Sequence, residues 1–254
     1  MICLISPSKD LNFKDSYPIS STDIPRLWEY SWPIVEVLKK KKSRDLQKLM
    51  DISVKLADEN VSRNQAFNQV FDQSNSRPAL FAFSGDVYRG IDAYHMKSNE
   101  LDYCQDHVRI LSGLYGLLRP FDLIQAYRLE MGTTLKIKRK PNLYKYWGNQ
   151  ITDLLNDDIT ANSAPFVVNL ASNEYFHAIQ PKHVVAPIIN IHFRELRAGK
   201  LIFVSYTAKV ARGLMIKHLA QMNGSTIKHV KSFNLDQYSY DESKSTDTDL
   251  FFIR

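Results

Sequence analysis

Short hydrophobic runs recur along the chain, and most are followed by a polar loop and then by residues at helical spacing. Apolar runs of about four to eight residues bounded by turn residues indicate buried strands. The predicted strands span residues 1–6, 78–83, 164–170, 184–196 and 200–206, with a short edge strand at 250–253. The turn at Ala198–Gly199 is expected to join 184–196 and 200–206 into a hairpin.

Helical spacing of apolar residues predicts the helices between these strands. They span residues 24–42, 43–50, 53–71, 99–108, 142–156 and 208–222. Pro33 is expected to break or kink the first of them. Because strands alternate with helices and no repeat or linker divides the chain, we predict one α/β (α+β) domain over residues 1–254.

The central stretch, residues 108–133, reads VRILSGLYGLLRPFDLIQAYRLEMGT. An apolar segment, the turn Gly113–Gly116 and a second apolar segment follow one another without a spacer. If both segments are helices, the second begins with free N–H groups, and such a helix start binds phosphate readily. The stretch then predicts a helix-hairpin-helix-like element over about residues 98–125, although that motif usually has one residue between its glycines and here there are two. A buried connector whose glycines permit close packing is the alternative.

Composition adds a basic balance to this picture. The 254 residues carry a net charge of +6, and the sequence pI is near 9.1, which permits phosphate-rich partners without establishing one. Cys3 and Cys104 alone support neither a disulfide framework nor a zinc site, and they indicate a reducing compartment. No apolar run approaches membrane-spanning length, and the N-terminal run lacks the basic flank of a signal peptide. We therefore expect a cytoplasmic protein without membrane contact, and no metal-ligand spacing or nucleotide-cofactor fingerprint predicts a metal or a cofactor.

Polar side chains gather where the predicted strands end, which is where α/β folds commonly place binding groups. These strand ends carry Ser6, Lys9, Asp86, Asn169, Ser172 and Glu174. They are expected to line one basic cleft together with Tyr127, Arg128, Glu130, Lys209 and Arg212. Simpler explanations stay open: Asp86 and Ser172 as helix caps, Arg128 and Glu130 as a pair on one face of an alternating strand over 127–131, and the lysines as solvated groups.

Two basic runs lie outside this set. Lys39–Lys42 closes a predicted helix, where it complements the helix dipole or contacts DNA. Lys136–Lys140 is the densest cluster, and it is either a solvated loop or a group that neutralises several phosphates.

The sequence resembles the YaaA family of bacterial peroxide stress resistance proteins. Besides the central stretch, the resemblance rests on blocks that occur in family order along nearly the whole chain. They are Ser6–Lys9 (SPSK), Phe83–Gly90 (FSGDVYRG), Leu143–Gly148 (LYKYWG), Asn169–Phe176 (NLASNEYF) and Tyr206–Met215 (YTAKVARGLM). One departure lies at Ser232–Tyr238, where glycines are expected before the Phe and the Tyr.

The resemblance implies resistance to hydrogen peroxide through a lowering of free intracellular iron, and so of the damage that iron causes. It also implies a single mixed-sheet domain of unusual topology, with flanking helices and a helix-hairpin-helix-like element beside a basic cleft. Non-specific binding of duplex DNA by a monomer follows, since phosphate contacts carry no base specificity. The expected phosphate-binding residues are Arg109, Gly113, Gly116, Arg119, Arg128, Lys209 and Arg212.

The second hypothesis is an enzyme that acts on a small anionic or nucleotide-like substrate in the same cleft. Lys9 would be its nucleophile or base, and Glu130 or Glu174 its proton donor. Arg128, Lys209 and Arg212 would hold the anion. The excess of charged and amide groups at strand ends, beyond what binding of a DNA backbone needs, motivates this hypothesis.

Overall fold

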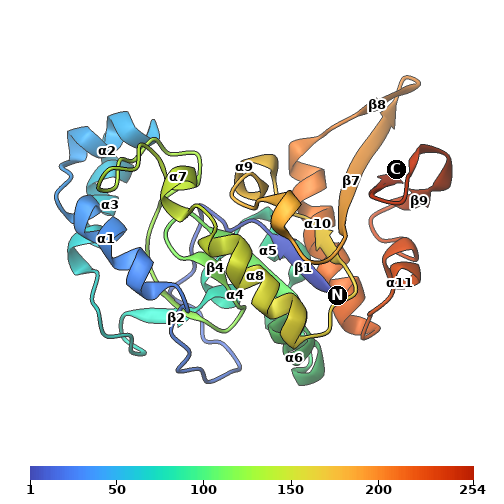
Figure 1. Cartoon of the computed structure of the whole chain (residues 1–254), viewed down its shortest axis with the longest axis horizontal. Coiled ribbons are helices and arrows are strands. Elements are labelled where there is room, and N and C mark those ends of the chain that lie inside the picture. Colours follow the sequence, from blue (N-terminus) through green and yellow to red (C-terminus); the bar gives the residue numbers. More distant parts are fainter.

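The computed structural model describes residues 1–254 as one α/β domain with a mainly parallel sheet and flanking helices (Figure 1). The strands are β1 (Ile2–Ile5), β2 (Ser76–Pro78), β3 (Val108–Ser112), β4 (Gly116–Leu118), β5 (Leu123–Gln125), β6 (Val167–Asn169), β7 (Ile188–Arg197), β8 (Lys200–Ile202), β9 (Ser239–Asp241) and β10 (Asp249–Ile253). The helices are α1 (Trp28–Lys39), α2 (Ser43–Met50), α3 (Val54–Ala66), α4 (Ala79–Ala82), α5 (Asp86–Ile91), α6 (Ser98–His107), α7 (Leu143–Trp147), α8 (Gln150–Ala161), α9 (Asn173–Phe176), α10 (Ser205–Gln221) and α11 (Ile227–Lys231). Short 3₁₀ turns lie at Ala93–His95, Pro181–His183 and Glu242–Lys244.

The main sheet has the order β4-β3-β1-β6-β7-β10-β9, and β8 pairs only with β7. Its middle is parallel: β3, β1, β6, β7 and β10 run the same way, while β4, β8 and β9 pair antiparallel. The strands β2 and β5 form a separate antiparallel pair. Because β1 and β6 are parallel neighbours, the loops that follow them leave the same edge of the sheet.

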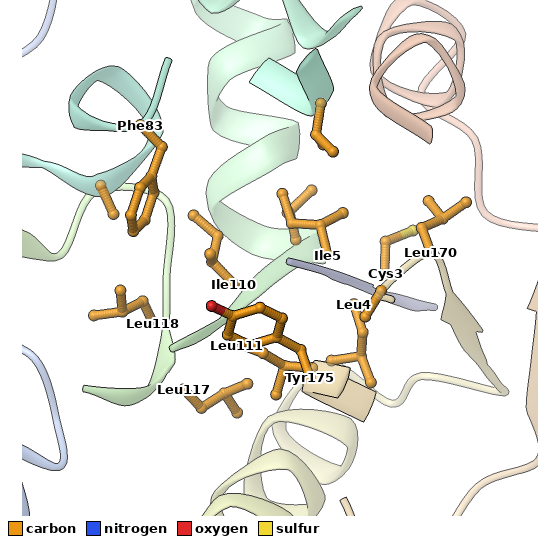
Figure 2. Packing of buried hydrophobic residues seen from close by; sticks show 14 of the residues in the cluster. Cys3, Leu4, Ile5, Phe83, Ile110, Leu111, Leu117, Leu118, Leu170 and Tyr175 are labelled. Atoms are coloured by element: carbon orange, nitrogen blue, oxygen red, sulfur yellow. The ribbon is translucent and has the colours of Figure 1, made fainter. Parts of the chain in front are cut away.

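The first strand is buried on both faces. Cys3 and Ile5 point to one side of β1 and Leu4 to the other, so helices on both sides pack against it (Figure 2). All four residues of β1 are buried, as the continuous apolar run predicted. The strand therefore anchors the loop that begins at Ser6.

Two glycines let α5 and α10 pack backbone to backbone. A Cβ atom on Gly90 would overlap the carbonyl oxygen of Val210, and one on Gly213 would overlap that of Val87. This contact places α10 directly against the first turns of α5. Gly213 therefore serves helix packing, and it does not open the surface of α10 to an anion.

The predicted helix-hairpin-helix-like element over residues 98–125 is wrong. Only α6 is helical there, because the two apolar segments form the antiparallel strands β3 and β4. β3 pairs with β1 inside the sheet, and its backbone groups are satisfied by that neighbour. The turn between them is buried, and Gly116 closes it with a φ of 71°.

Several other elements differ from the prediction. Residues 78–83 hold the end of β2 and the single helical turn α4, and residues 127–131 form no strand. The predicted helix 142–156 is divided into α7 and α8 at Gly148, which has a φ of 52°. β10 is not an edge strand, since it lies between β7 and β9. The predictions of β1, β6, α2, α10 and the hairpin at Ala198–Gly199 are confirmed.

None of the helices combines the length and the apolar character that crossing a bilayer requires.

Candidate functional site

A cavity of about 220 Å³ opens at the edge of the sheet where β1 and β6 end. Its walls come from the loop after β1, the starts of α5 and α9, and one side of α10. Of the predicted cleft residues, those that line it are Ser6, Lys9, Asp86, Ser172, Glu174, Lys209 and Arg212. The structure thus brings together side chains that are up to about two hundred residues apart in sequence, because parallel strands deliver their loops to one edge.

The floor of the cavity is fixed by hydrogen bonds between the two strand ends. The backbone N–H of Ser172 donates to Ser6 Oγ at 2.9 Å, and the two serine hydroxyls are 3.3 Å apart. The hydroxyl of Tyr88, from α5, donates to the Ser6 carbonyl at 3.1 Å. Ser172 precedes α9 as predicted, but its hydroxyl bonds to Ser6 and does not cap the helix.

Lys209 and Arg212 form a cationic wall without a carboxylate partner. Neither takes part in any ion pair of the structure. Burial, with the nearby charge of Arg194, lowers the pKa of Arg212 to about 10, so the guanidinium is still charged at neutral pH. Its Nε atom is buried and has no hydrogen-bond partner. The charge of Arg212 is therefore half-buried and not neutralised by any carboxylate of the protein.

Lys9 stands between this cavity and a much smaller one. Its Nζ lies 3.0 Å from Glu130 Oε1, which also accepts a hydrogen bond from Arg128 at 3.0 Å. The small cavity measures about 10 Å³, and Lys9, Tyr127, Arg128 and Glu130 are among the residues that line it. Glu130 Oε2 and Arg128 Nε are both buried without a partner. Arg128 and Glu130 therefore form an ion pair, as the simpler explanation expected. The pair lies beside the cavity and not on an open surface.

The remaining carboxylates of the cavity have defined partners. Glu174 Oε1 accepts from the backbone N–H of Gly132 at 3.0 Å, which ties α9 to the loop after Glu130. Asp86 lies in the first turn of α5 and pairs with Arg89, and the N-cap position belongs to Gly85. The predicted capping role of Asp86 is therefore wrong by one position.

Asn169 and Tyr127 shape the site from outside the larger cavity. Asn169 donates to Asn190 Oδ1 at 3.0 Å and accepts from the N–H of Ala171 at 3.1 Å, so it braces the loop after β6. The hydroxyl of Tyr127 lies 2.7 Å from Ser112 Oγ, and burial raises the pKa of this phenol. Both residues are structural neighbours of the groups that line the cavity.

Four residues predicted to bind phosphate lie elsewhere. Arg109 is 3% exposed, and its Nε donates to Asp158 at 2.6 Å inside the protein. Gly113 and Gly116 are buried in the β3–β4 turn, so no phosphate can reach their amides. Arg119 is half-buried and pairs with Asp122 at 2.9 Å and with Asp23 at 3.2 Å. The shortness of the two apolar segments was the signal in the sequence, since strands are typically shorter than helices.

Sequence reasoning missed the rest of the lining, namely Pro7, Ser8, Asp10, Gly85, Val87, Tyr88 and Tyr175. Gly85 has a clear role, because a Cβ there would overlap the hydroxyl of Ser8. The loop after β1 and the start of α5 can therefore touch. A glycine between a serine and an aspartate after an apolar run was the signal for this close approach.

Chemically, the site holds two cations without a carboxylate partner, Lys209 and Arg212, and an ion pair between Lys9 and Glu130 at 3.0 Å. No group of three or more His, Cys, Asp or Glu side chains lies close enough together to hold a metal ion. Both cysteines are buried, and burial raises the pKa of the Cys3 thiol to about 12. Cys3 is therefore not a reactive thiolate.

Comparisons with known proteins find similar sequences along nearly the whole chain. The family model described as peroxide stress protein YaaA matches residues 1–244. A UPF0246 protein of Marinomonas sp. (strain MWYL1) is 44% identical over 251 residues, which are 99% of this chain and 96% of that protein. A UPF0246 protein of Flavobacterium johnsoniae is 43% identical over the whole of both chains. A UPF0246 protein of Aliivibrio fischeri (strain ATCC 700601 / ES114) is 42% identical over 100% of this chain and 98% of its own.

Proposed function

The chain belongs to the family of the peroxide stress protein YaaA, and from this premise we propose that it protects the cell by binding a small anionic or nucleotide-like ligand in the cavity at the strand ends. The observation that carries the proposal is the wall of Lys209 and Arg212. These two cations face a cavity and have no carboxylate partner. A bound anion would supply the missing counter-charge and accept the free N–H of Arg212.

The same site suits catalysis on that ligand. Lys9 would be the nucleophile or base, and Glu130, whose Oε1 lies 3.0 Å from Lys9 Nζ, would hold this side chain in place. Glu174 would act as the proton donor on another part of the wall. Arg128 is already bonded to Glu130, so its proposed role is to orient Glu130, while Lys209 and Arg212 hold the anion.

The ligand-binding test uses inorganic phosphate as the probe. Phosphate should raise the thermal midpoint of the wild-type protein, and the rise should be lost in Arg212→Gln and in Lys209→Gln. Lys182→Gln removes the same charge from an exposed site outside the cavity, and it should leave the rise unchanged. The proposal fails if phosphate stabilises Arg212→Gln as well as it stabilises the wild type.

The catalytic part is tested in the cell. Lys9→Met keeps the length of the side chain without its charge, and Lys9 is 60% exposed, so the fold should survive. A deletion strain that carries Lys9→Met should be as sensitive to hydrogen peroxide as the empty deletion strain. Full protection by this variant would exclude an essential role for Lys9.

A second candidate is non-specific binding of duplex DNA, with a lowering of free intracellular iron as the cellular result. Four exposed cations favour it: Lys136, Lys138, Arg139 and Lys140 lie on one loop and form no ion pair. Such a loop can contact the DNA backbone without reading bases. The iron part requires that the deletion strain regain resistance to hydrogen peroxide when an iron chelator is added. Equal sensitivity with and without chelator would remove iron from the proposal.

A further inference from the structure

Two aromatic rings stand exposed just before and at the start of α10, the helix that carries Lys209 and Arg212. Phe203 is 53% exposed and Tyr206 is 58% exposed, and both belong to the segment that links β8 to α10. This segment lies at the base of the β7–β8 hairpin, which projects from the body of the molecule (Figure 1). Large aromatic side chains gathered on a surface indicate a binding role more often than single exposed ones do.

An arginine lies over each ring. The guanidinium of Arg89 lies 6.0 Å from the Tyr206 ring, and Arg89 also pairs with Asp86 of the cavity wall. The guanidinium of Arg194 lies 5.4 Å from the Phe203 ring, and its charge acts on Arg212.

The helix itself brings Tyr206 close to the cationic wall. Tyr206 precedes Lys209 by three positions on α10, and residues so spaced are neighbours on a helix surface, with about 5–6 Å between their Cβ atoms. The exposed ring of Tyr206 and the cavity-lining Lys209 are therefore neighbours on the surface of α10.

The size of the cavity limits what can bind. A volume of about 220 Å³ is below the roughly 300–1,000 Å³ of pockets that enclose a whole drug-sized ligand. A phosphate with part of a sugar fits inside, and an attached base would lie outside the cavity, over the exposed rings. Duplex DNA offers no free base face at this point, since its bases are paired and stacked on one another.

We propose that the site binds a nucleotide unit, with its phosphate on Lys209 and Arg212 and its base stacked on Tyr206. This inference rests on the anion site proposed above and adds the class of ligand. Stacking on an aromatic ring tolerates any base, so the site has no sequence preference. Phe203 extends the platform for a second base when the unit belongs to a single strand.

The charges around the rings argue against an apolar protein partner. Arg89 lies over Tyr206, Arg194 lies over Phe203, and Lys209 follows Tyr206 by three positions on α10. An apolar partner would strip water from these cations without replacing it. A nucleotide satisfies both kinds of group, because its base covers the rings and its phosphate meets the cations.

The experiment measures binding of a fluorescein-labelled single-stranded dT oligonucleotide, of AMP and of inorganic phosphate. Tyr206→Ala should weaken binding of the oligonucleotide and of AMP by about tenfold, the loss expected for one stacked base, and Tyr206→Phe should restore it. Phosphate binding should be unchanged in Tyr206→Ala and lost in Arg212→Gln. Tyr30→Ala, which removes an exposed tyrosine from α1, is the matched control and should behave as wild type.

The outcomes separate this inference from the function it rests on. If only AMP binding depends on Tyr206, the ligand is a free nucleotide. If only oligonucleotide binding depends on Tyr206, the ligand is a single strand. If both depend on it, the site accepts either source. If wild type binds phosphate but Tyr206→Ala binds AMP and the oligonucleotide unchanged, or if wild type binds neither, the nucleotide inference is overturned while the anion site stands. If wild type does not bind phosphate at all, the proposed function itself fails.

Discussion

Single residues decide how closely the walls of the cavity approach one another. Gly90 and Gly213 remove the side chains that would separate α5 from α10, and Gly85 does the same between α5 and Ser8. Lys209 and Arg212 are carried by α10, so their position relative to Asp86 depends on this close packing. Glycines that carry no functional group thus set the distances between the side chains of the cavity.

Gly213→Ala should destabilise the protein, because the new methyl group would overlap the carbonyl oxygen of Val87, which is backbone and cannot rotate away. Overpacking costs about 1–3 kcal/mol, and an overlap with backbone lies in the upper part of that range, at about 2–3 kcal/mol. The better helix propensity of alanine offsets about 1 kcal/mol of it. We expect a net loss of about 1–2 kcal/mol, seen as a thermal midpoint about 2–8 °C lower. Lys209→Ala, on the exposed side of the same helix, is the control and should melt like wild type. An unchanged midpoint for Gly213→Ala would show that α5 and α10 are not in backbone contact.

The ion pairs and hydrogen bond of Glu195 lead us to expect that the protein loses stability at acid pH. The hydroxyl of Thr207, with Arg197 and Arg254, lowers the pKa of this carboxyl from 4.5 to about 2. A lowered folded-state pKa means that the stabilisation is present above the unfolded pKa and is lost as the pH falls from about 4.5 to about 2. Glu195→Gln should therefore melt below wild type at neutral pH, and the gap should close as the pH is lowered through this window.

The control for that measurement is Glu242→Gln, which alters an exposed carboxyl outside any ion pair. Its midpoint should follow wild type at every pH. A gap between Glu195→Gln and wild type that stays constant from neutral pH down to about pH 2.5 would contradict the lowered pKa.

At the scale of elements, the sequence predicted strands and helices best where they carry their own signals. The buried run of β1, the Ala198–Gly199 hairpin and the amphipathic α10 have such signals, and they are confirmed. The apolar segments of β3 and β4 carry no periodic signal, because about four apolar residues in a row fit the pattern of a buried strand and of a buried helix, and only their shortness favours a strand. Their strand structure depends on pairing with β1, a partner about one hundred residues away in sequence, and periodicity does not report such a contact.

The β3–β4 turn gives a test of its role as a packing element. Gly116 has a φ of 71°, and a Cβ there would lie 2.8 Å from Leu27 and 2.9 Å from Trp147. Left-handed backbone costs an L-residue about 1–2 kcal/mol and overpacking about 1–3 kcal/mol. Gly116→Ala should thus lower the free energy of unfolding, measured in denaturant, by about 2–5 kcal/mol.

Gly199→Ala separates the two contributions. Gly199 has a similar φ of 74°, but a Cβ added there would meet no other group within 4 Å, so only the backbone cost of about 1–2 kcal/mol applies. Equal losses for both variants would show that Gly116 is not packed against Leu27 and Trp147.

At the scale of the whole molecule, the sequence predicted that residues after the strand ends lie together. It did not predict which of the arginines have a free charge. Parallel strands end at one edge, so the polar groups after β1 and β6 had to meet. Arg109 and Arg119 are held instead by carboxylates that are distant in sequence and near only in the fold. Arg109 pairs with Asp158, and Arg119 pairs with Asp23 as well as with its sequence neighbour Asp122. An arginine in a sequence does not show whether its charge is free or already neutralised.

The two candidate functions use different surfaces, and this allows a final prediction. Each phosphate contact adds about 0.9 to the slope of log affinity against log salt for duplex DNA. If the loop of Lys136, Lys138, Arg139 and Lys140 binds duplex, changing all four to Gln should lower that slope by about three to four units. Lys209→Gln/Arg212→Gln should leave the slope unchanged, because a cavity of about 220 Å³ does not admit a duplex. Circular dichroism must show that both variants are folded. A loop variant with the wild-type slope would remove this loop from duplex binding, and a lower slope in the cavity variant would place the duplex contacts at the cavity mouth.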